Sequence, residues 1–472
     1  MSVSADDIKF RKSVVVTDTV ANGGRVGYVQ ILSGVKHNLF PRVTKSERTA
    51  GVTRYRKQFI CNENSADEIA YSALVYLEFP TNAGDRILAA LGTKEDTQND
   101  LDSTYKWASC GPLNAGVSAG GVTVAIAMEN TDVDILNGGL IHIANKYESG
   151  TVDTTARIGD SVEYSVPLSK WMPIAHTDDV IYPNGLYLGG SKVMTIQPTD
   201  TEEWLRIADP VYTAEDIGTG DGVDTAPPLT TLANVPICLD SDKLPVVTTL
   251  DGADVAMTVN VAADGTCSGD CSAGTLNMET GVWTVDITWT SAPKNAQDIL
   301  VTYHERAHTW SGSVVTIALD DMLANNYLAA ETYVGICLEL GDIEPVFLDW
   351  VEISSAGTYD ESTYPLVLSN LGTVTDSFTI TFTDATHFGC AGVAEGSLGS
   401  GIVTSDFAPI NPNTGLPYFT LDKDGWSGSW VLGDTVTFKT VASAVGVWLK
   451  EIVPALTAAE PFNLLVLGLY CE

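Results

Sequence analysis

Alternation of apolar and polar residues along short segments is the feature that most constrains how this chain can fold. Residues 282–289 (VWTVDITW) place valine, isoleucine and tryptophan opposite threonine and aspartate, and residues 71–79 (YSALVYLEF) and 377–383 (SFTITFT) repeat the pattern. Successive side chains of a strand point to opposite faces, so a sheet with one buried face requires this period of two. The pattern predicts an all-β fold.

Helical periodicity is scarce. The best candidates for helices are residues 85–92 (DRILAALG) and 319–332 (LDDMLANNYLAAET), and both are short. The 42 glycines and 20 prolines are spread along the chain, which suits short strands joined by tight turns. We therefore expect several β-sandwich domains with little helix.

The length of 472 residues suggests about three domains. Residues 209–228 are rich in Gly, Asp and Pro and are typical of a linker. Strand-like segments follow at short, regular spacing, at 254–261, 282–289 and 298–304. This spacing predicts an inserted immunoglobulin-like domain over residues 222–304.

Charge is distributed very unevenly. Residues 1–60 carry eleven Lys/Arg and four Asp/Glu, whereas the other 412 residues carry fourteen basic and fifty-six acidic side chains, for a net charge of −35. An acidic body repels nucleic acid and anionic membranes, so we expect neither as a partner. The basic positions of residues 36–57 are Lys36, Arg42, Lys45, Arg48, Arg54, Arg56 and Lys57.

Two interpretations of this basic segment remain open. Residues 1–19 look like an N-terminal arm, and an arm followed by a basic strip could dock on the acidic body of an adjacent subunit. The same separation of charge could instead reflect ion pairs within one monomer. We predict the first, with the seven basic residues as a protein-interaction site.

No stretch approaches the roughly 18 continuous apolar residues of a membrane span, and the first twelve residues lack the apolar region of a secretory signal. We expect a soluble protein that is made in the cytoplasm. No phosphate-binding or dinucleotide-binding loop is found, so we predict no cofactor and no small-molecule substrate.

His304, Glu305 and His308 match the H-E-x-x-H zinc motif, which works because a helix brings its two histidines onto one face. Here β-branched residues 299–303 precede the motif, and in an extended chain the histidines would lie about 13 Å apart. We predict that His304 ends a strand, that His308 lies beyond a turn, and that they share no metal.

Two further matches stand in the wrong context for chemistry. Residues 116–120 (GVSAG) fit a nucleophile elbow, but they run from a loop into a strand rather than from a strand into a helix. Residues 422–425 (DKDG) lack the remaining carboxylates of a calcium loop and indicate a tight turn. We predict no catalytic and no metal-binding residues, and hence that the chain is not an enzyme.

Most of the eight cysteines stand in apolar, strand-like contexts and are expected to be buried thiols. Cys267 and Cys271 are the exception. Their spacing could close a small disulfide loop or supply half of a metal site, and these alternatives remain open.

Two blocks of the chain resemble virion structural proteins of tailed bacteriophages, of the contractile-tail and baseplate ("ripcord") type. The first block, residues 33–64, contains an Asn-rich "LF" turn and a G-x-x-x-YRK strand. The second, residues 405–472, contains GDTVTF followed by W-x-K-x-x-VPA. Residues 130–147 (NTDVDILNGGLIHIANKY) are similar to a recurring piece of contractile-tail proteins. The inserted domain resembles small immunoglobulin-like domains of phage tail proteins.

The resemblance implies that the two blocks form one discontinuous β-sandwich, built from residues 20–110 and 360–472. A β-rich, tail-protein-like domain is then expected at 111–210 and a connecting β/α segment at 305–359. The implied role is a structural part of the virion, in the tail or baseplate, with other virion proteins and copies of itself as partners. The alternatives are capsid decoration, a neck protein, or a receptor- or carbohydrate-binding module in which Trp310 and Trp426 would be exposed.

Overall fold

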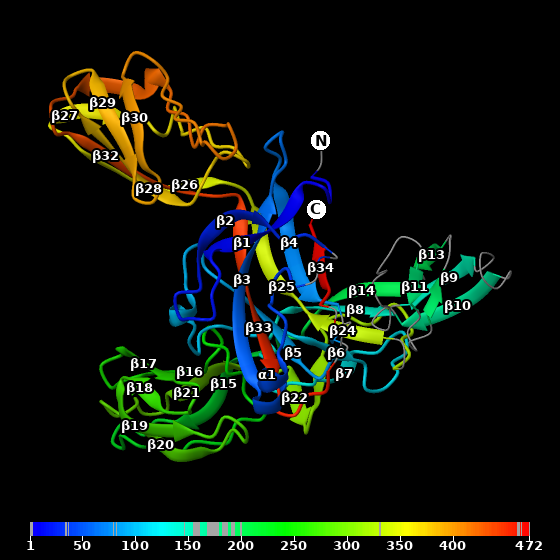
Figure 1. Ribbon diagram of the computed structural model, residues 1–472. Helices are drawn as coiled ribbons and strands as arrows, with labels where there is room; N and C mark the ends of the chain where they lie inside the picture. The colour runs from blue at the N-terminus through cyan, green and yellow to red at the C-terminus, as the bar shows by residue number, and fades with distance from the viewer. Residues whose placement is uncertain are drawn as a thin grey trace. The chain divides into compact units, whose positions relative to one another are not determined.

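A computed structural model describes residues 3–145 except 34, 36, 79 and 82, then residues 201–329, 332–459, 463 and 465–471. Between 147 and 198 it describes only the backbone of five strands. The described residues are nearly all β, as the alternating pattern predicts, and their one α-helix is the short α1 (Lys45–Ala50) (Figure 1). The all-β prediction is confirmed.

The chain divides into two compact units. The first comprises Met1–Ser109, Ser169–Lys192 and Cys337–Glu472, and the second comprises Cys110–Leu168 and Val193–Ile336. Each unit is therefore assembled from segments that lie far apart in the sequence.

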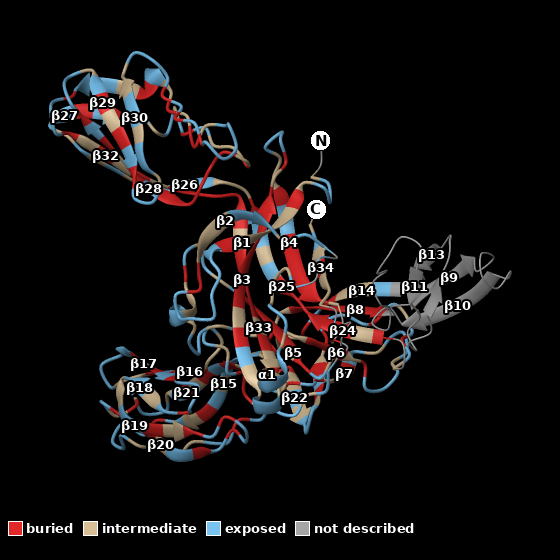
Figure 2. Ribbon diagram, in the orientation of Figure 1, coloured by how far each residue is buried: buried red, intermediate tan, exposed pale blue. Residues whose placement is uncertain are grey.

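The first unit is built on an antiparallel five-stranded sheet. Its order is β2-β1-β3-β33-β5, with bounds β1 Ile8–Val15, β2 Gly23–Gln30, β3 Val52–Asn62, β5 Arg86–Leu91 and β33 Ala444–Val453. β3 and β33 pair without interruption from Val52 opposite Val453 to Cys61 opposite Ala444. They are the most deeply buried strands of this sheet (Figure 2), and β3 comes from the block at 33–64 while β33 comes from the block at 405–472.

A three-stranded sheet of the same unit has the order β25-β4-β34. Its bounds are β4 Ala70–Leu77, β25 Leu338–Ile343 and β34 Leu467–Tyr470. Residues Ala73 to Leu77 of β4 are all buried, so both faces of this strand are covered rather than one.

Residues 346–441 form a sandwich within the first unit, joined to it by two short connections. Only two residues lie between Ile343 of β25 and Val346, and only two between Val441 and Ala444 of β33. One sheet has the order β26-β32-β28-β29-β30 and the other pairs β27 with β31. The bounds are β26 Val346–Ile353, β27 Ala356–Tyr359, β28 Asp376–Phe382, β29 His387–Gly392, β30 Gly396–Ile402, β31 Trp426–Ser429 and β32 Thr435–Val441.

Aromatic side chains fill the core of this sandwich. Phe382 stacks on Trp430 with 4.2 Å between ring centroids, and Phe378 and Phe438 lie 5.6 Å apart. Alternate residues of β28 face this core, so the alternation of residues 377–383 holds as predicted.

The second unit holds two smaller sheets. The first has the order β14-β8-β24-β6 and the second the order β22-β23-β7. Their bounds are β6 Cys110–Pro112, β7 Thr123–Ala127, β8 Leu140–Asn145, β14 Thr201–Arg206, β22 His308–Ser311, β23 Val314–Ala318 and β24 Thr332–Ile336.

A module with its own core also belongs to the second unit. Its five-stranded sheet has the order β15-β21-β16-β17-β18, and β19 pairs with β20. The bounds are β15 Val211–Thr219, β16 Val246–Leu250, β17 Ala256–Val261, β18 Cys267–Gly269, β19 Cys271–Leu276, β20 Trp283–Trp289 and β21 Asp298–His304. The three strands predicted between 254 and 304 are present, while the immunoglobulin-like assignment stays a prediction.

The remaining strands are described by their backbone alone. β9 lies between β10 and β13, and β11 pairs with β12. Their bounds are β9 Tyr147–Asp153, β10 Ser161–Pro167, β11 Asp179–Ile181, β12 Tyr187–Gly189 and β13 Met194–Pro198.

Both predicted helices are wrong. Residues 86–91 form β5, whose run from Ile87 to Ala90 is buried on both faces, and a short continuous apolar run cannot be told from a helix by its period. Residues 319–329 form turns and bridges. Glu203 accepts hydrogen bonds from the backbone N–H groups of Ala324 and Asn325, which a helix would use within its own backbone.

Three boundary predictions also need correction. The predicted N-terminal arm contains β1, which pairs with β2 on one side and, over Ile8–Lys12, with β3 on the other, so it is a strand of the first unit's own sheet rather than a free arm. The predicted linker contains β15, a full strand of the module. The segment 305–359 contributes strands to several sheets, and its described residues contain no helix.

Among the described residues, no helix is long and apolar enough to cross a membrane.

Candidate functional site

The basic segment separates into a buried half and an exposed half. Arg54, Arg56 and Lys57 are buried on β3, whereas Arg42 and Lys45 are exposed and Arg48 is half-buried. Lys36 lies outside the described residues. The interaction-site prediction is wrong for the three β3 residues, because a central strand directs them into the monomer and the alternative of internal ion pairs holds there.

Each buried cation has an acidic partner contributed by another segment. Arg54 Nη1 lies 3.3 Å from Glu451 on β33, Arg56 Nη2 lies 2.6 Å from Asp18, and Lys57 Nζ lies 2.5 Å from Asp96. The partner residues are therefore Asp18, Asp96 and Glu451, which come from both ends of the chain. These pairs tie β3 to the strands and loops around it.

Asp96 is the centre of the most enclosed of these networks. Its Oδ1 accepts from Lys57 and Thr93, and its Oδ2 accepts from Tyr105 (2.6 Å) and Trp448 Nε1 (2.7 Å). Burial opposes ionisation, but the hydrogen bonds from Lys57, Tyr105 and Trp448 hold the pKa of Asp96 below its usual value. The carboxylate is thus fully occupied by donors from its own chain.

For Glu451, in contrast to Asp96, the effects that raise the pKa outweigh those that lower it. Burial and the nearby Asp85 raise the pKa of Glu451 to about 7, against the attraction of Arg54. Arg54 is shared, since its other terminal nitrogen contacts Glu47 in helix α1. Hydrogen bonds from Thr44, the N-cap of that helix, and the contact with Arg54 lower the pKa of Glu47 to about 2.

The buried arginines also hold the loop in front of α1. Arg54 Nη1 donates to the carbonyl oxygen of Pro41 (3.3 Å), and the Arg56 guanidinium lies 5.8 Å from the centre of the Phe40 ring. Thr44 and Glu47 form a reciprocal capping box that starts the helix. The exposed Arg42 therefore lies on a loop, and the exposed Lys45 at the start of a helix, that the buried arginines of β3 hold in place.

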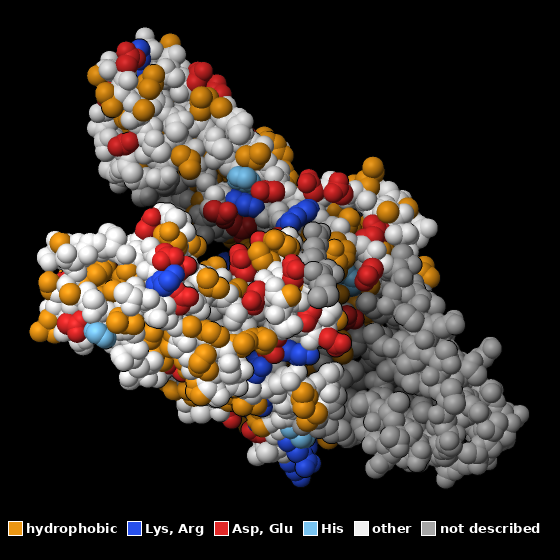
Figure 3. Space-filling view, turned by 90° about the horizontal axis from the view of Figure 1, so that it is seen from above, with side chains coloured by type: hydrophobic (Ala, Val, Ile, Leu, Met, Phe, Trp, Pro, Cys, Tyr) orange, Lys and Arg blue, Asp and Glu red, His pale blue; other side chains and the backbone are white. Residues whose placement is uncertain are grey.

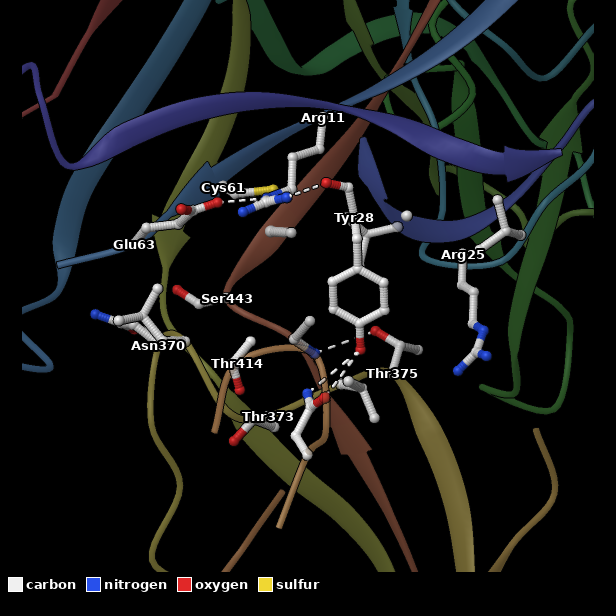
Figure 4. Close-up of a pocket in the computed structure, with 18 residues that line it drawn as sticks. Arg11, Arg25, Tyr28, Cys61, Glu63, Asn370, Thr373, Thr375, Thr414 and Ser443 are labelled. Carbon is white, nitrogen blue, oxygen red and sulfur yellow. Dashed lines mark hydrogen bonds and ion pairs between the residues drawn. The ribbon is translucent and has the colours of Figure 1, made fainter. Parts of the chain in front are cut away.

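A cavity of about 80 Å³ lies between β1, β2 and loops of the 346–441 sandwich (Figure 4). Its charged groups are already paired, Arg11 with Glu63 and Arg25 with Glu395. The hydroxyl of Ser443 and Oδ1 of Asn370 are buried on its wall and have no hydrogen-bond partner among the described residues. This size and lining suit a few water molecules and do not bring a nucleophile together with a base.

The H-E-x-x-H residues lie as predicted. His304 is the last residue of β21 and His308 the first of β22, so a turn separates them. Nδ1 of His304 lies 2.8 Å from Asp209, whereas burial and the nearby Arg306 lower the pKa of His308 to about 4. The two imidazoles are thus in different environments.

The other motifs also have structural roles. Residues 116–120 lead through a turn at Gly120 into β7, and residues 423–425 form a single 3₁₀ turn capped by Asp422. Cys267 and Cys271 are free thiols, and burial raises the pKa of Cys267 to about 11. The described residues contain no group of three His, Cys, Asp or Glu side chains placed to hold a metal.

The two tryptophans expected to be exposed are both half-buried. Trp426 packs on Tyr359, Phe382, Phe388 and Trp430, with ring centroids 4.7 to 5.5 Å apart. Trp426 therefore packs against the sandwich core among four aromatic neighbours rather than standing free on a sugar-binding surface.

Sequence reasoning missed an apolar surface on strand β26. Val346, Leu348, Val351 and Ile353 are all exposed, and Ile353 is 66% exposed. Alternation in this strand is broken by an extra residue, so no period-two signal marks it. Apolar and acidic side chains are interspersed with few basic ones on the face that Figure 3 shows.

Comparisons with known proteins identify no family for this chain. No protein-family model matches it, and no curated protein matches it. A solved structure of the infectious bursal disease virus VP2 subviral particle is 11% identical, covers 82% of this chain and 80% of its own, and has a TM-score of 0.08. The Faustovirus major capsid protein is 10% identical, with 92% and 93% covered and a TM-score of 0.07. TM-scores this low carry no argument about fold or function.

Proposed function

We propose that this chain is a structural component of a bacteriophage virion, placed in the contractile tail or baseplate. It would be synthesised in the host cytoplasm and join the particle through contacts with the tube, neighbouring baseplate subunits or copies of itself. No enzymatic activity, cofactor or nucleic acid is part of this proposal.

The observation that carries the proposal is the pairing of β3 with β33. The two blocks that resemble phage tail proteins are separated by about 340 residues, yet their strands pair at ten consecutive positions. Such a pairing is what a single discontinuous domain requires, with the intervening residues inserted between its halves.

The interactions of the described residues support a structural role. The charged groups of β3 are occupied by ion pairs within the chain, and the aromatic side chains of the 346–441 sandwich are packed against one another. Buried networks of this kind fix one arrangement of the strands. Rigid β-modules joined by short connections suit a subunit that must keep its shape within a larger assembly.

Antibody labelling of intact particles tests the location. An antibody against the 346–441 sandwich, coupled to gold, should mark the tail or baseplate in electron micrographs of purified phage. Labelling of the capsid or the neck would correct the location while keeping the virion role. Particles that carry no label in native or partly dissociated form would contradict the proposal.

A further inference from the structure

Strand β26 is the edge of its sheet among the described residues, and its outer face is apolar. Val346, Leu348, Val351 and Ile353 pair with Val441, Lys439, Thr437 and Thr435 of β32, so these four apolar residues share the face turned away from the core. Phe347 and Trp350 point the other way and pack against the aromatic core. A row of exposed aliphatic side chains on an edge strand favours contact with another chain.

A groove continues this row at the start of the strand. It measures about 430 Å³ and is lined by Ile69, Pro345, Phe347, Leu366 and Leu368, with Val346 shared between groove and row. Asp67 and Glu344 also line it, and Asp349 is exposed at the bulge of β26. We call the groove and the row together the acceptor surface.

The carboxylates of the acceptor surface are not neutralised within the chain. The described residues form no ion pair with Asp67, Glu344 or Asp349. An apolar surface bordered by three uncompensated carboxylates fits an occupant that is itself apolar and carries positive charge.

The segment from the end of β2 to the start of α1 has this chemistry. Val29 is 61% exposed and Leu32 53% exposed, and Arg42 and Lys45 are exposed without an ion pair among the described residues. Phe40 and Pro41 are held by the buried Arg56 and Arg54, so the segment is anchored at its base. We call Val29, Leu32, Arg42 and Lys45 the donor residues.

We infer that the donor residues of one copy dock on the acceptor surface of a second copy of this chain. Opposite charge selects this pairing, because most of a chain with a net charge of −35 would repel a second copy elsewhere. Two β26 strands are poorly suited to pair with each other, since the bulge at Asp349 interrupts the edge and would bring like charges together. The contact is therefore between different surfaces, which generates rings or stacks rather than closed dimers.

This inference rests on the proposed function. Variants with reversed charges test the contact between copies without testing whether the protein is part of the virion. In the variant Arg42→Glu/Lys45→Glu, acidic donor residues face acidic acceptor surfaces. In the variant Glu344→Lys/Asp349→Lys, basic donor residues face basic acceptor surfaces. Sedimentation velocity of the full chain at about 50 µM and low salt should show higher-order species for the wild type, and each double variant should weaken association at least about tenfold. The species should also dissociate at about 0.5 M salt, because exposed charge pairs are screened.

Mixing the two variants is the decisive arm. In the mixture every donor meets an acceptor of opposite charge, so association should return to the wild-type level. Lys423→Glu and Glu361→Lys change the charge in the same two directions elsewhere in the first unit, each by half as much as the matching double variant, and should leave association unchanged. A monomeric wild type, or a mixture that stays dissociated, would overturn the inference. If the protein is nevertheless found in purified particles, the proposed function survives that failure.

Discussion

Lys57 Nζ lies 2.5 Å from Asp96 Oδ1, and both side chains are almost completely shielded from solvent. The ammonium also donates to the carbonyl oxygens of Gly24 (2.8 Å) and Asp96 (3.0 Å), so its three hydrogens are all used. One buried cation thus joins β3 to the start of β2 and to the loop after β5.

Removing one member of this pair should destabilise the first unit strongly. We expect Asp96→Ala to cost about 3–5 kcal/mol in the free energy of unfolding, since it leaves an ammonium buried without a counter-charge. Urea unfolding followed by tryptophan fluorescence measures this loss, with Trp448 in the same network as a reporter. The double variant Lys57→Met/Asp96→Leu should be closer to the wild type than Asp96→Ala. Asp96→Ala within about 1 kcal/mol of the wild type would contradict this account of the pair.

Glu451 should make the stability of the first unit fall as the pH rises. Its folded pKa of about 7 lies above the ordinary value of 4.5, so the folded state binds the proton more tightly. The stabilisation is complete below about pH 4.5 and is lost by about pH 7, with a total of up to about 3 kcal/mol. Comparing urea unfolding of the wild type and Glu451→Gln at both ends of this range isolates the effect. A difference between them that does not change with pH would argue against a protonated Glu451.

His308 should make the stability of the second unit fall as the pH falls. Burial lowers its folded pKa to about 4, below the ordinary value of 6.5, so the unfolded state takes up the proton first. Stability contributed by the neutral imidazole should therefore be lost as the pH falls from about 6.5 to about 4. Thermal unfolding of the wild type and His308→Phe across this range tests the point, and the variant should lose less stability on acidification. Equal losses in the two proteins would count against it.

The module of the second unit should fold only when β15 is included. Ile217 of this strand is fully buried in the module core, and β15 pairs along β21. A fragment of residues 209–305 should unfold cooperatively in urea, whereas residues 222–304, which omit β15, should be unfolded or aggregated. Cooperative unfolding of the shorter fragment would show that β15 is dispensable.

His304 and His308 should not form a zinc site. The purified protein is expected to contain far less than one zinc per chain after incubation with the metal and desalting, and His304→Ala should not change that value. Elemental analysis measures the ratio. Stoichiometric zinc that is lost in His304→Ala would show that the turn between the two histidines rearranges around a metal.

The alternation of residues 282–289 and 377–383 was sufficient to predict strands, because a one-sided sheet imposes its period directly on the sequence. The same logic failed for residues 86–91, which are buried on both faces and so carry no period. The ion pairs of the basic residues on β3 could not be predicted from the sequence either, because their acidic partners come from distant segments. These pairs are Arg54 with Glu451, Arg56 with Asp18, and Lys57 with Asp96. The β26 surface was hidden because its bulge breaks the alternation at Asp349.

Quantitative mass spectrometry of gradient-purified phage particles tests the central claim most directly. If the chain is a tail or baseplate component, its peptides should co-purify with the particles at a constant ratio to other virion proteins through repeated gradient purification at low salt. Peptides that occur in the infected-cell lysate but are absent from the particles would contradict the claim.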